Sequence, residues 1–134
     1  MSIVPPPIEE LLTETFAPGR TLNYRKKELI YRRGDTPSGV YLIRSGTVKV
    51  YALNARMEED TIFTFGPGEL LLLRWGLTGI VGDVYIVAMS PVEVTQLSRP
   101  DFMSAIYERP QVAVRLLEVL AGHTGLLIDR IAKS

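Results

Sequence analysis

The sequence contains no cysteine and a single histidine, His123. Without thiols the chain can form neither a disulfide nor a cysteine-ligated zinc or iron–sulfur site, and it lacks a thiolate nucleophile. Nothing around His123 resembles the nucleophile, base and orienting group of a catalytic set. A lone histidine on an apolar helical stripe is typical of a packing or interface residue. We therefore expect no catalytic residue, no metal site and no enzymatic activity.

The sequence also lacks an excess of either charge, because 15 basic residues balance 15 acidic ones. A domain that grips DNA phosphates normally has a basic surplus, so this chain is not expected to bind DNA through its own residues. No basic stretch followed by a long apolar one comes after Met1, and the longest apolar run, Val84 to Met89, is too short to cross a bilayer. These absences predict a cytoplasmic protein without a signal peptide or membrane contact.

What is present between Thr21 and Ser98 is a β pattern. Segments rich in branched and aromatic residues alternate with turn signals about every 8–12 residues, the spacing of a sandwich or barrel. Residues 39–44 and 47–51 are predicted to pair as a hairpin around Ser45-Gly46. Residues 84–88 and 92–97 are predicted to form a last pair around Ser90-Pro91.

Helical signals lie on either side of the β region. A short amphipathic helix is predicted before Pro18, and Ser98, followed by Asp101, predicts an N-capped helix that runs to Tyr107. Pro110 suits the first position of a long helix that can run to Ser134.

The long helix carries two apolar stripes. One has the alternating spacings of a coiled-coil seam and consists of Ala113, Leu117, Leu120, Thr124, Leu127 and Ile131. The other lies on an adjacent face and consists of Val112, Leu116, Val119, His123 and Leu126. We expect one stripe to cover the β region and the seam to form the interface of a homodimer. The alternative is that both stripes are buried in the core of a monomer.

The order of these signals is similar to that of a known family. Glu28 to Asp35 and Gly39 to Tyr51 give a Gly-Asp turn, a strong strand, a glycine turn and a second strand, and Phe65 to Glu69 continue the pattern. With the two last helices, this resembles the N-terminal effector domain of the Crp/Fnr family of bacterial transcription regulators. The resemblance covers residues 15–134.

The resemblance implies a mainly β fold with some α: a cyclic-nucleotide-binding-like β jelly roll, or double-stranded β-helix, over residues 1–109. Residues 110–134 would then be a dimerisation helix of the same domain. It also implies a helix-turn-helix domain that reads DNA, which would follow this helix and is not present in this chain. We expect the chain to be either a truncated piece of such a regulator, which we favour, or a stand-alone sensor module.

The family's phosphate cassette is altered here. The resemblance places the cassette glycine at Leu72, the ribose-binding glutamate at Leu73, and the phosphate-binding arginine at Gly82 or Asp83. An uncompensated Asp83 would oppose a phosphate 4 Å away by about 4 kcal/mol at an effective dielectric of about 20. Cyclic nucleotide binding is therefore disfavoured, and no cofactor is expected.

The expected ligand site is instead apolar or amphipathic. Arg74 can substitute as a cation from the other end of the loop, and Thr124 falls where nucleotide-binding members place a helix hydroxyl. The predicted ligand-binding residues are Leu71, Leu72, Leu73, Arg74, Trp75, Gly82, Asp83 and Thr124.

These features predict an effector-sensing and dimerisation domain of a Crp/Fnr-like regulator. An input to the β region would shift the two long helices and hence DNA-reading heads that must match half-sites about 34–36 Å apart. The alternatives are a stand-alone cyclic-nucleotide-binding module that acts on a protein partner and a purely structural interaction domain.

Overall fold

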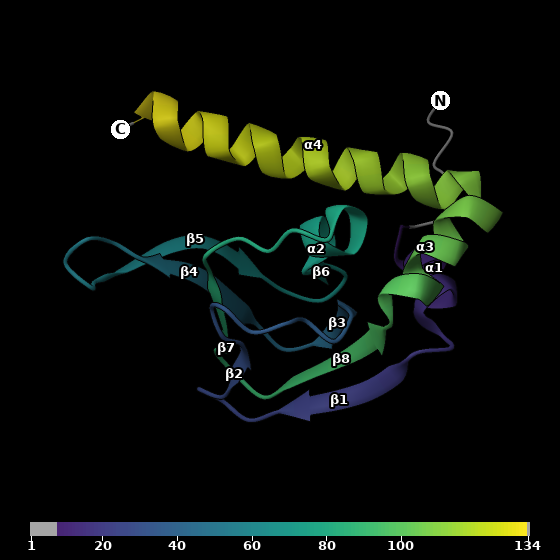
Figure 1. Ribbon diagram of the computed structural model, residues 1–134, viewed down its shortest axis with the longest axis horizontal. Coiled ribbons are helices and arrows are strands. Elements are labelled where there is room, and N and C mark those ends of the chain that lie inside the picture. Colours follow the sequence, from purple (N-terminus) through teal and green to yellow (C-terminus); the bar gives the residue numbers. More distant parts are fainter. Residues whose placement is uncertain (1–7, 134) are drawn as a thin grey trace.

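Two antiparallel sheets face each other in the computed structural model, which describes residues 8–133 (Figure 1). One sheet has the order β1 (Arg20–Tyr24), β8 (Val92–Leu97), β3 (Val40–Ser45) and β6 (Leu70–Leu71). The other has the order β2 (Leu29–Tyr31), β7 (Tyr85–Ala88), β4 (Val48–Leu53) and β5 (Glu59–Phe65). The expected jelly-roll fold class is confirmed.

The chain changes sheets at both places where a hairpin was predicted, so those two predictions are wrong. β3 pairs with β8 and β6, whereas β4 pairs with β5 and β7. Gly46 makes the first corner at φ +89°, and a Cβ there would lie 2.2 Å from the carbonyl oxygen of Pro91 in the second corner. The Thr47 N–H donates to Ser90 Oγ at 3.0 Å, so the two corners brace each other.

The core between the sheets comes from the period-two alternation of the strands. Inward-facing Ile43, Val48 and Val94 are fully buried, and Ala88 lies with them. The interior is therefore apolar on both faces, as the strand patterns predict.

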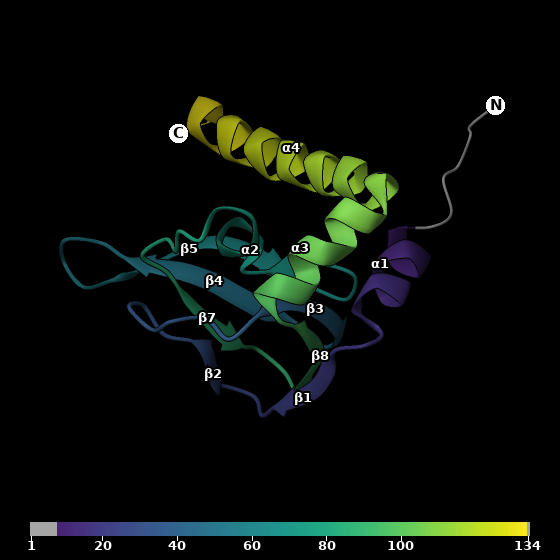
Figure 2. The same cartoon turned by 45° about the vertical axis from the view of Figure 1, so that its right-hand side comes forward.

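Helices α1 (Ile8–Phe16) and α3 (Arg99–Glu108) stand at one end of the roll (Figure 2). The short helix α2 (Leu73–Thr78) lies between the roll and the long helix α4 (Pro110–Lys133) (Figure 1). A second core forms at this end of the roll, in which the rings of Phe16 and Phe102 meet at 6.2 Å. Ser98 accepts a hydrogen bond from the Asp101 N–H at 3.2 Å, which confirms the predicted N-cap.

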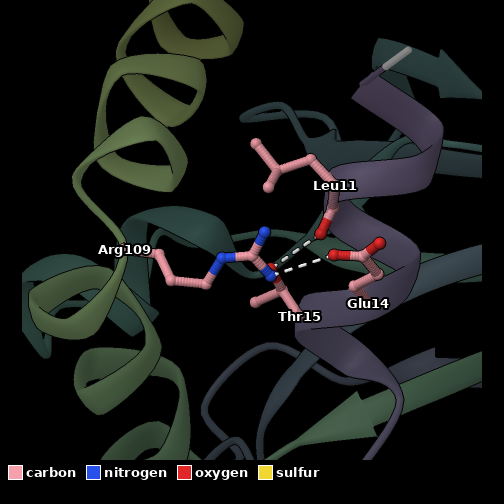
Figure 3. Close-up of polar contacts among 4 residues, drawn as sticks. All are labelled: Leu11, Glu14, Thr15 and Arg109. Atoms are coloured by element: carbon pink, nitrogen blue, oxygen red, sulfur yellow. Dashed lines mark hydrogen bonds and ion pairs between the residues drawn. The ribbon is translucent and has the colours of Figure 1, made fainter. Parts of the chain in front are cut away.

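The junction between α3 and α4 is tied to α1. Arg109 donates to the Glu14 carboxylate at 3.2 Å, and the Thr15 hydroxyl donates to the Leu11 carbonyl at 2.8 Å (Figure 3). The exposed ion pair contributes little by itself, but it lies beside the buried apolar contacts of α1. These contacts fix the point from which α4 leaves.

Helix α4 lies across the roll rather than inside it (Figure 1). Val112 and Leu116 are buried in its first half, and near its end Arg130 donates to the carbonyls of Thr61 and Ile62 on β5. Among the described residues, α4 is the one helix long and apolar enough to cross a membrane: an 18-residue stretch within Pro110–Ala132 has a mean hydropathy of 1.3, and 11% of that stretch is buried. Much apolar surface of α4 is thus uncovered in a single chain.

Candidate functional site

A cavity of about 310 Å³ lies between the roll and α4. Its walls are β-strand side chains, the segment from Leu70 to Val84, and the inner face of α4. The lining residues are Val50, Phe63, Phe65, Leu70, Leu71, Leu72, Leu73, Arg74, Trp75, Ile80, Val81, Gly82, Val84, Ile86, Leu120, His123 and Leu127. The volume corresponds to about ten liquid waters, which is at the lower end for small-molecule sites.

The segment that walls the cavity is shaped by backbone turns. Gly68, at φ +90°, makes the corner before β6, and its N–H donates to the Ile43 carbonyl at 2.9 Å. β6 then adds briefly to β3 before α2 begins. Gly79, at φ +76°, ends α2 and sends the chain back over the cavity. The loop is thus anchored at both ends and leaves a space beneath it.

Leu72, the residue before α2, has the left-handed backbone conformation, with φ 63° and ψ 28°. This is the position at which the resemblance places the cassette glycine. The conformation costs an L-residue about 1–2 kcal/mol, and glycine adopts it without that penalty. The half-buried side chain of Leu72 packs against the core between the sheets. Leu72 therefore holds a backbone conformation that glycine adopts more easily, and its side chain contributes packing there.

Arg74 supplies the cation at the cavity wall. Its side chain is exposed, and within residues 8–133 its guanidinium makes no ion pair or hydrogen bond. A Cβ placed on Gly82 would lie 3.7 Å from Arg74 Nη1, so the absence of a side chain there leaves room beside the guanidinium. Arg74 and Gly82 bring a cation and an open space together.

His123 is the second polar side chain of the lining. Its ring lies 5.1 Å from that of Phe63 and 5.2 Å from that of Phe65. Burial lowers the pKa of His123, an effect that Glu69 partly opposes, so the imidazole is neutral at pH 7. Its Nε2 is buried and has no hydrogen-bond partner among residues 8–133. An unsatisfied buried nitrogen costs about 1–3 kcal/mol, which a bound water or ligand would recover.

Six of the residues predicted to bind a ligand line the cavity: Leu71, Leu72, Leu73, Arg74, Trp75 and Gly82. Asp83 does not line it. Its carboxylate is 83% exposed and pairs with Arg33 at 3.5 Å, so the expectation of an uncompensated charge at this position is wrong. Thr124 is also outside the lining, and its hydroxyl donates to the Leu120 carbonyl at 3.0 Å.

Several lining residues were not predicted to bind a ligand, and two of them, Leu120 and Leu127, were assigned to the dimer seam instead. Phe63 and Phe65 come from β5, and Leu120, His123 and Leu127 come from α4. The two phenylalanines are two residues apart and therefore face the same side of a strand. That alternation could have identified them.

The predicted dimer seam is divided in the structure. Leu117, Thr124 and Ile131 are exposed, whereas Leu120 and Leu127 line the cavity, and Ala113 is half-buried. A continuous exposed stripe instead follows alternating spacings of three and four, and we call it the outer stripe: Val114, Leu117, Ala121, Thr124, Ile128 and Ile131. The same helix thus presents one apolar face to the cavity and another to solvent.

Comparisons with known proteins match this architecture. The family described as "Cyclic nucleotide-binding domain" matches residues 21–109. The chain is 31% identical over 98 residues to the cyclic AMP receptor protein of Thermus thermophilus, covering 73% of this chain and 45% of the relative. It is 30% identical over 108 residues to the transcriptional activator protein FnrA of Stutzerimonas stutzeri, covering 77% and 41%.

A solved structure has the same fold over nearly the whole chain. The Thermus thermophilus catabolite activator protein superposes with a TM-score of 0.78 at 26% identity, covering 97% of this chain and 61% of that one. The chain spans less than half the length of the two curated relatives.

Proposed function

Because the chain belongs to the cyclic nucleotide-binding domain family and has Crp/Fnr-type transcription regulators as relatives, we propose that it is the effector-sensing and dimerisation domain of such a regulator. In this role its cavity takes an apolar or amphipathic effector rather than a cyclic nucleotide. Residues 110–134 act as the dimerisation helix of the same domain as residues 1–109. The domain is not an enzyme, acts in the cytoplasm and reaches DNA through a helix-turn-helix domain outside these residues.

The observation that carries this proposal is the apolar lining of the cavity. Leu73 stands where the resemblance places the ribose-binding glutamate, and it is 4% exposed and packed into the end core. It offers no acceptor to a sugar hydroxyl. A nucleotide would therefore bury hydroxyls and base edges without partners, each at a cost of about 1–3 kcal/mol. The lining fits an apolar body much better.

The cavity and the proposed interface share one helix. Leu120, His123 and Leu127 of α4 form one wall of the cavity. Their sequence neighbours on α4, Leu117, Thr124 and Ile128, belong to the outer stripe and are exposed. An effector that fills the cavity would contact α4 from below and change how α4 lies on the roll. Gly122 and Gly125 each reduce helix propensity by about 1 kcal/mol relative to alanine, which makes this part of α4 easier to adjust.

The outer stripe is proposed to pair with the same stripe of a second copy. Val114, Leu117 and Ile128 are 56%, 66% and 58% exposed, and their spacing is that of a coiled-coil seam. A membrane is a poorer occupant of this face. Asp129 and Arg130 adjoin Ile128, and each charge at a bilayer centre costs about 2.5–3.5 kcal/mol. Arg130 is moreover held by β5.

Sedimentation equilibrium of the chain tests the dimer. The expected mass is twice the 15.0 kDa of one chain. Leu117→Glu, which places a charge in the outer stripe, should give the monomer mass with an unchanged β-sheet circular dichroism spectrum. Gln111→Glu adds a charge at an exposed position outside the stripe and should leave the dimer intact. A monomer mass for the unaltered chain at high concentration would refute the dimer.

The alternative function is a stand-alone cyclic-nucleotide-binding module that regulates a protein partner. One observation favours it, namely that Arg74 lines the cavity and could hold a phosphate. It predicts saturable binding of cyclic AMP or cyclic GMP by this chain, which the leading proposal does not.

A further inference from the structure

We propose that the cavity under α4 binds an anion with an apolar body, whose acidic group lies on Arg74 beside Gly82. This inference rests on the proposed sensing role of the cavity and names the chemical class of the effector. Small carboxylic acids with an aliphatic or aromatic body belong to this class.

The walls determine the body of the ligand. Beyond Arg74 and His123, every side chain that lines the cavity is apolar, and the aromatic rings of Phe63, Phe65 and Trp75 are among them. A charge pushed deep among such walls would lose its hydration without compensation. The apolar part of a ligand therefore belongs inside, and its charged part belongs at the exposed end.

The guanidinium of Arg74 determines the head group. The other arginines nearby are engaged: Arg33 pairs with Asp83, and Arg99 donates to the carbonyls of Trp75 and Gly76. Within residues 8–133 Arg74 has no such partner. Because Asp83 points to Arg33, no carboxylate of the described chain competes for Arg74. A planar guanidinium binds a carboxylate through two parallel hydrogen bonds.

Gly82 supplies the space for that head group. A side chain there would begin 3.7 Å from Arg74 Nη1, in van der Waals contact with the guanidinium. Its absence leaves one side of the guanidinium open next to the cavity. His123 adds no second positive charge, since burial keeps it neutral, and its buried Nε2 offers a hydrogen-bonding position for a polar atom on the ligand body.

Three probes with the same eight-carbon chain and different heads test the inference: octanoate, 1-octanol and octylamine. Trp75 lines the cavity and is the only tryptophan in the sequence, so its fluorescence reports binding directly. We expect octanoate to bind about tenfold more tightly than 1-octanol, which corresponds to one charge-assisted contact at a partly exposed site. Octylamine should bind more weakly than either.

Variants assign the preference to Arg74. Arg74→Gln should reduce octanoate affinity about tenfold and leave 1-octanol affinity unchanged. Arg56→Gln removes the same charge from another exposed arginine that does not line the cavity, and it should keep the preference. Gly82→Ala should also weaken octanoate binding, because its methyl group would occupy the space beside the guanidinium that the carboxylate is proposed to take.

Equal affinities for 1-octanol and octanoate would overturn the proposal that the ligand is an anion and would indicate a purely apolar cavity. Loss of the preference in Arg56→Gln, to the same degree as in Arg74→Gln, would overturn the assignment to Arg74. No response to any of the three probes would overturn the inference entirely. The dimer measurement is independent of all three results, so the proposed function can fail or stand separately.

Discussion

The left-handed backbone of Leu72 gives a prediction that reverses the usual order of two substitutions. Leu72→Ala removes a half-buried side chain, worth about 1 kcal/mol of burial, and keeps the unfavourable conformation. Leu72→Gly loses the same burial but relieves about 1–2 kcal/mol of backbone strain, less the extra entropy of an unfolded glycine. The glycine variant should therefore be more stable than the alanine variant by about 1 kcal/mol.

Thermal unfolding followed by circular dichroism measures this difference. For a chain of this size, about 1 kcal/mol corresponds to a few degrees in the melting temperature. Leu77 provides the matched control, because it is also half-buried but lies within α2. There Leu77→Gly should be less stable than Leu77→Ala by about 1 kcal/mol. If alanine is equal to or better than glycine at Leu72, the left-handed backbone conformation described above is wrong.

Three further predictions test other parts of the structure. Gly46→Ala should destabilise the fold by about 3 kcal/mol, because residue 46 has a φ of +89° and its Cβ would lie 2.2 Å from the Pro91 carbonyl oxygen. A melting temperature close to that of the unaltered chain would contradict this close approach of the two corners. Because the pKa of His123 is lowered in the folded state, the folded state binds fewer protons than the unfolded state, and the protein should lose stability as pH falls below about 6.5. The difference between the urea midpoints at pH 7.5 and pH 5.0 should therefore be smaller in His123→Phe than in the unaltered chain. An equal difference in both proteins would refute this role of His123. Arg130→Gln should remove the hydrogen bonds to the Thr61 and Ile62 carbonyls. Amide hydrogen exchange in the last two turns of α4 should then become faster, with little change in global stability. Unchanged hydrogen exchange in these turns would show that Arg130 does not hold the helix.

The signals that predicted the fold are local ones. Ser98 and Asp101 form the expected N-cap, and Pro110 begins α4, because capping and proline geometry depend on a few neighbouring residues. The alternating strands are found for the same reason. The turns at Ser45-Gly46 and Ser90-Pro91 were mistaken for hairpins because turn-forming residues have the same chemistry whether the next strand stays in the same sheet or crosses to the other sheet.

The ligand site was only partly predictable because its remaining parts come from distant residues. The segment from Leu71 to Trp75 could be identified from the family pattern, but the pairing of Asp83 with Arg33 joins residues far apart in the sequence. No local pattern reveals such a pair. On α4, Leu120 and Leu127 fit a coiled-coil spacing and yet face the cavity. A helix with two neighbouring apolar stripes does not indicate which one faces the roll until the roll is in place.

Isothermal titration calorimetry with cyclic AMP tests the central claim, an apolar sensing cavity on a nucleotide-sensor fold, most directly. The unaltered chain should give no binding heat at millimolar nucleotide, because Leu73 and the surrounding walls offer no partners for the ribose and base. Cyclic GMP should behave in the same way. Saturable binding at micromolar concentration that is lost in Arg74→Gln would contradict the account and establish the nucleotide as the ligand.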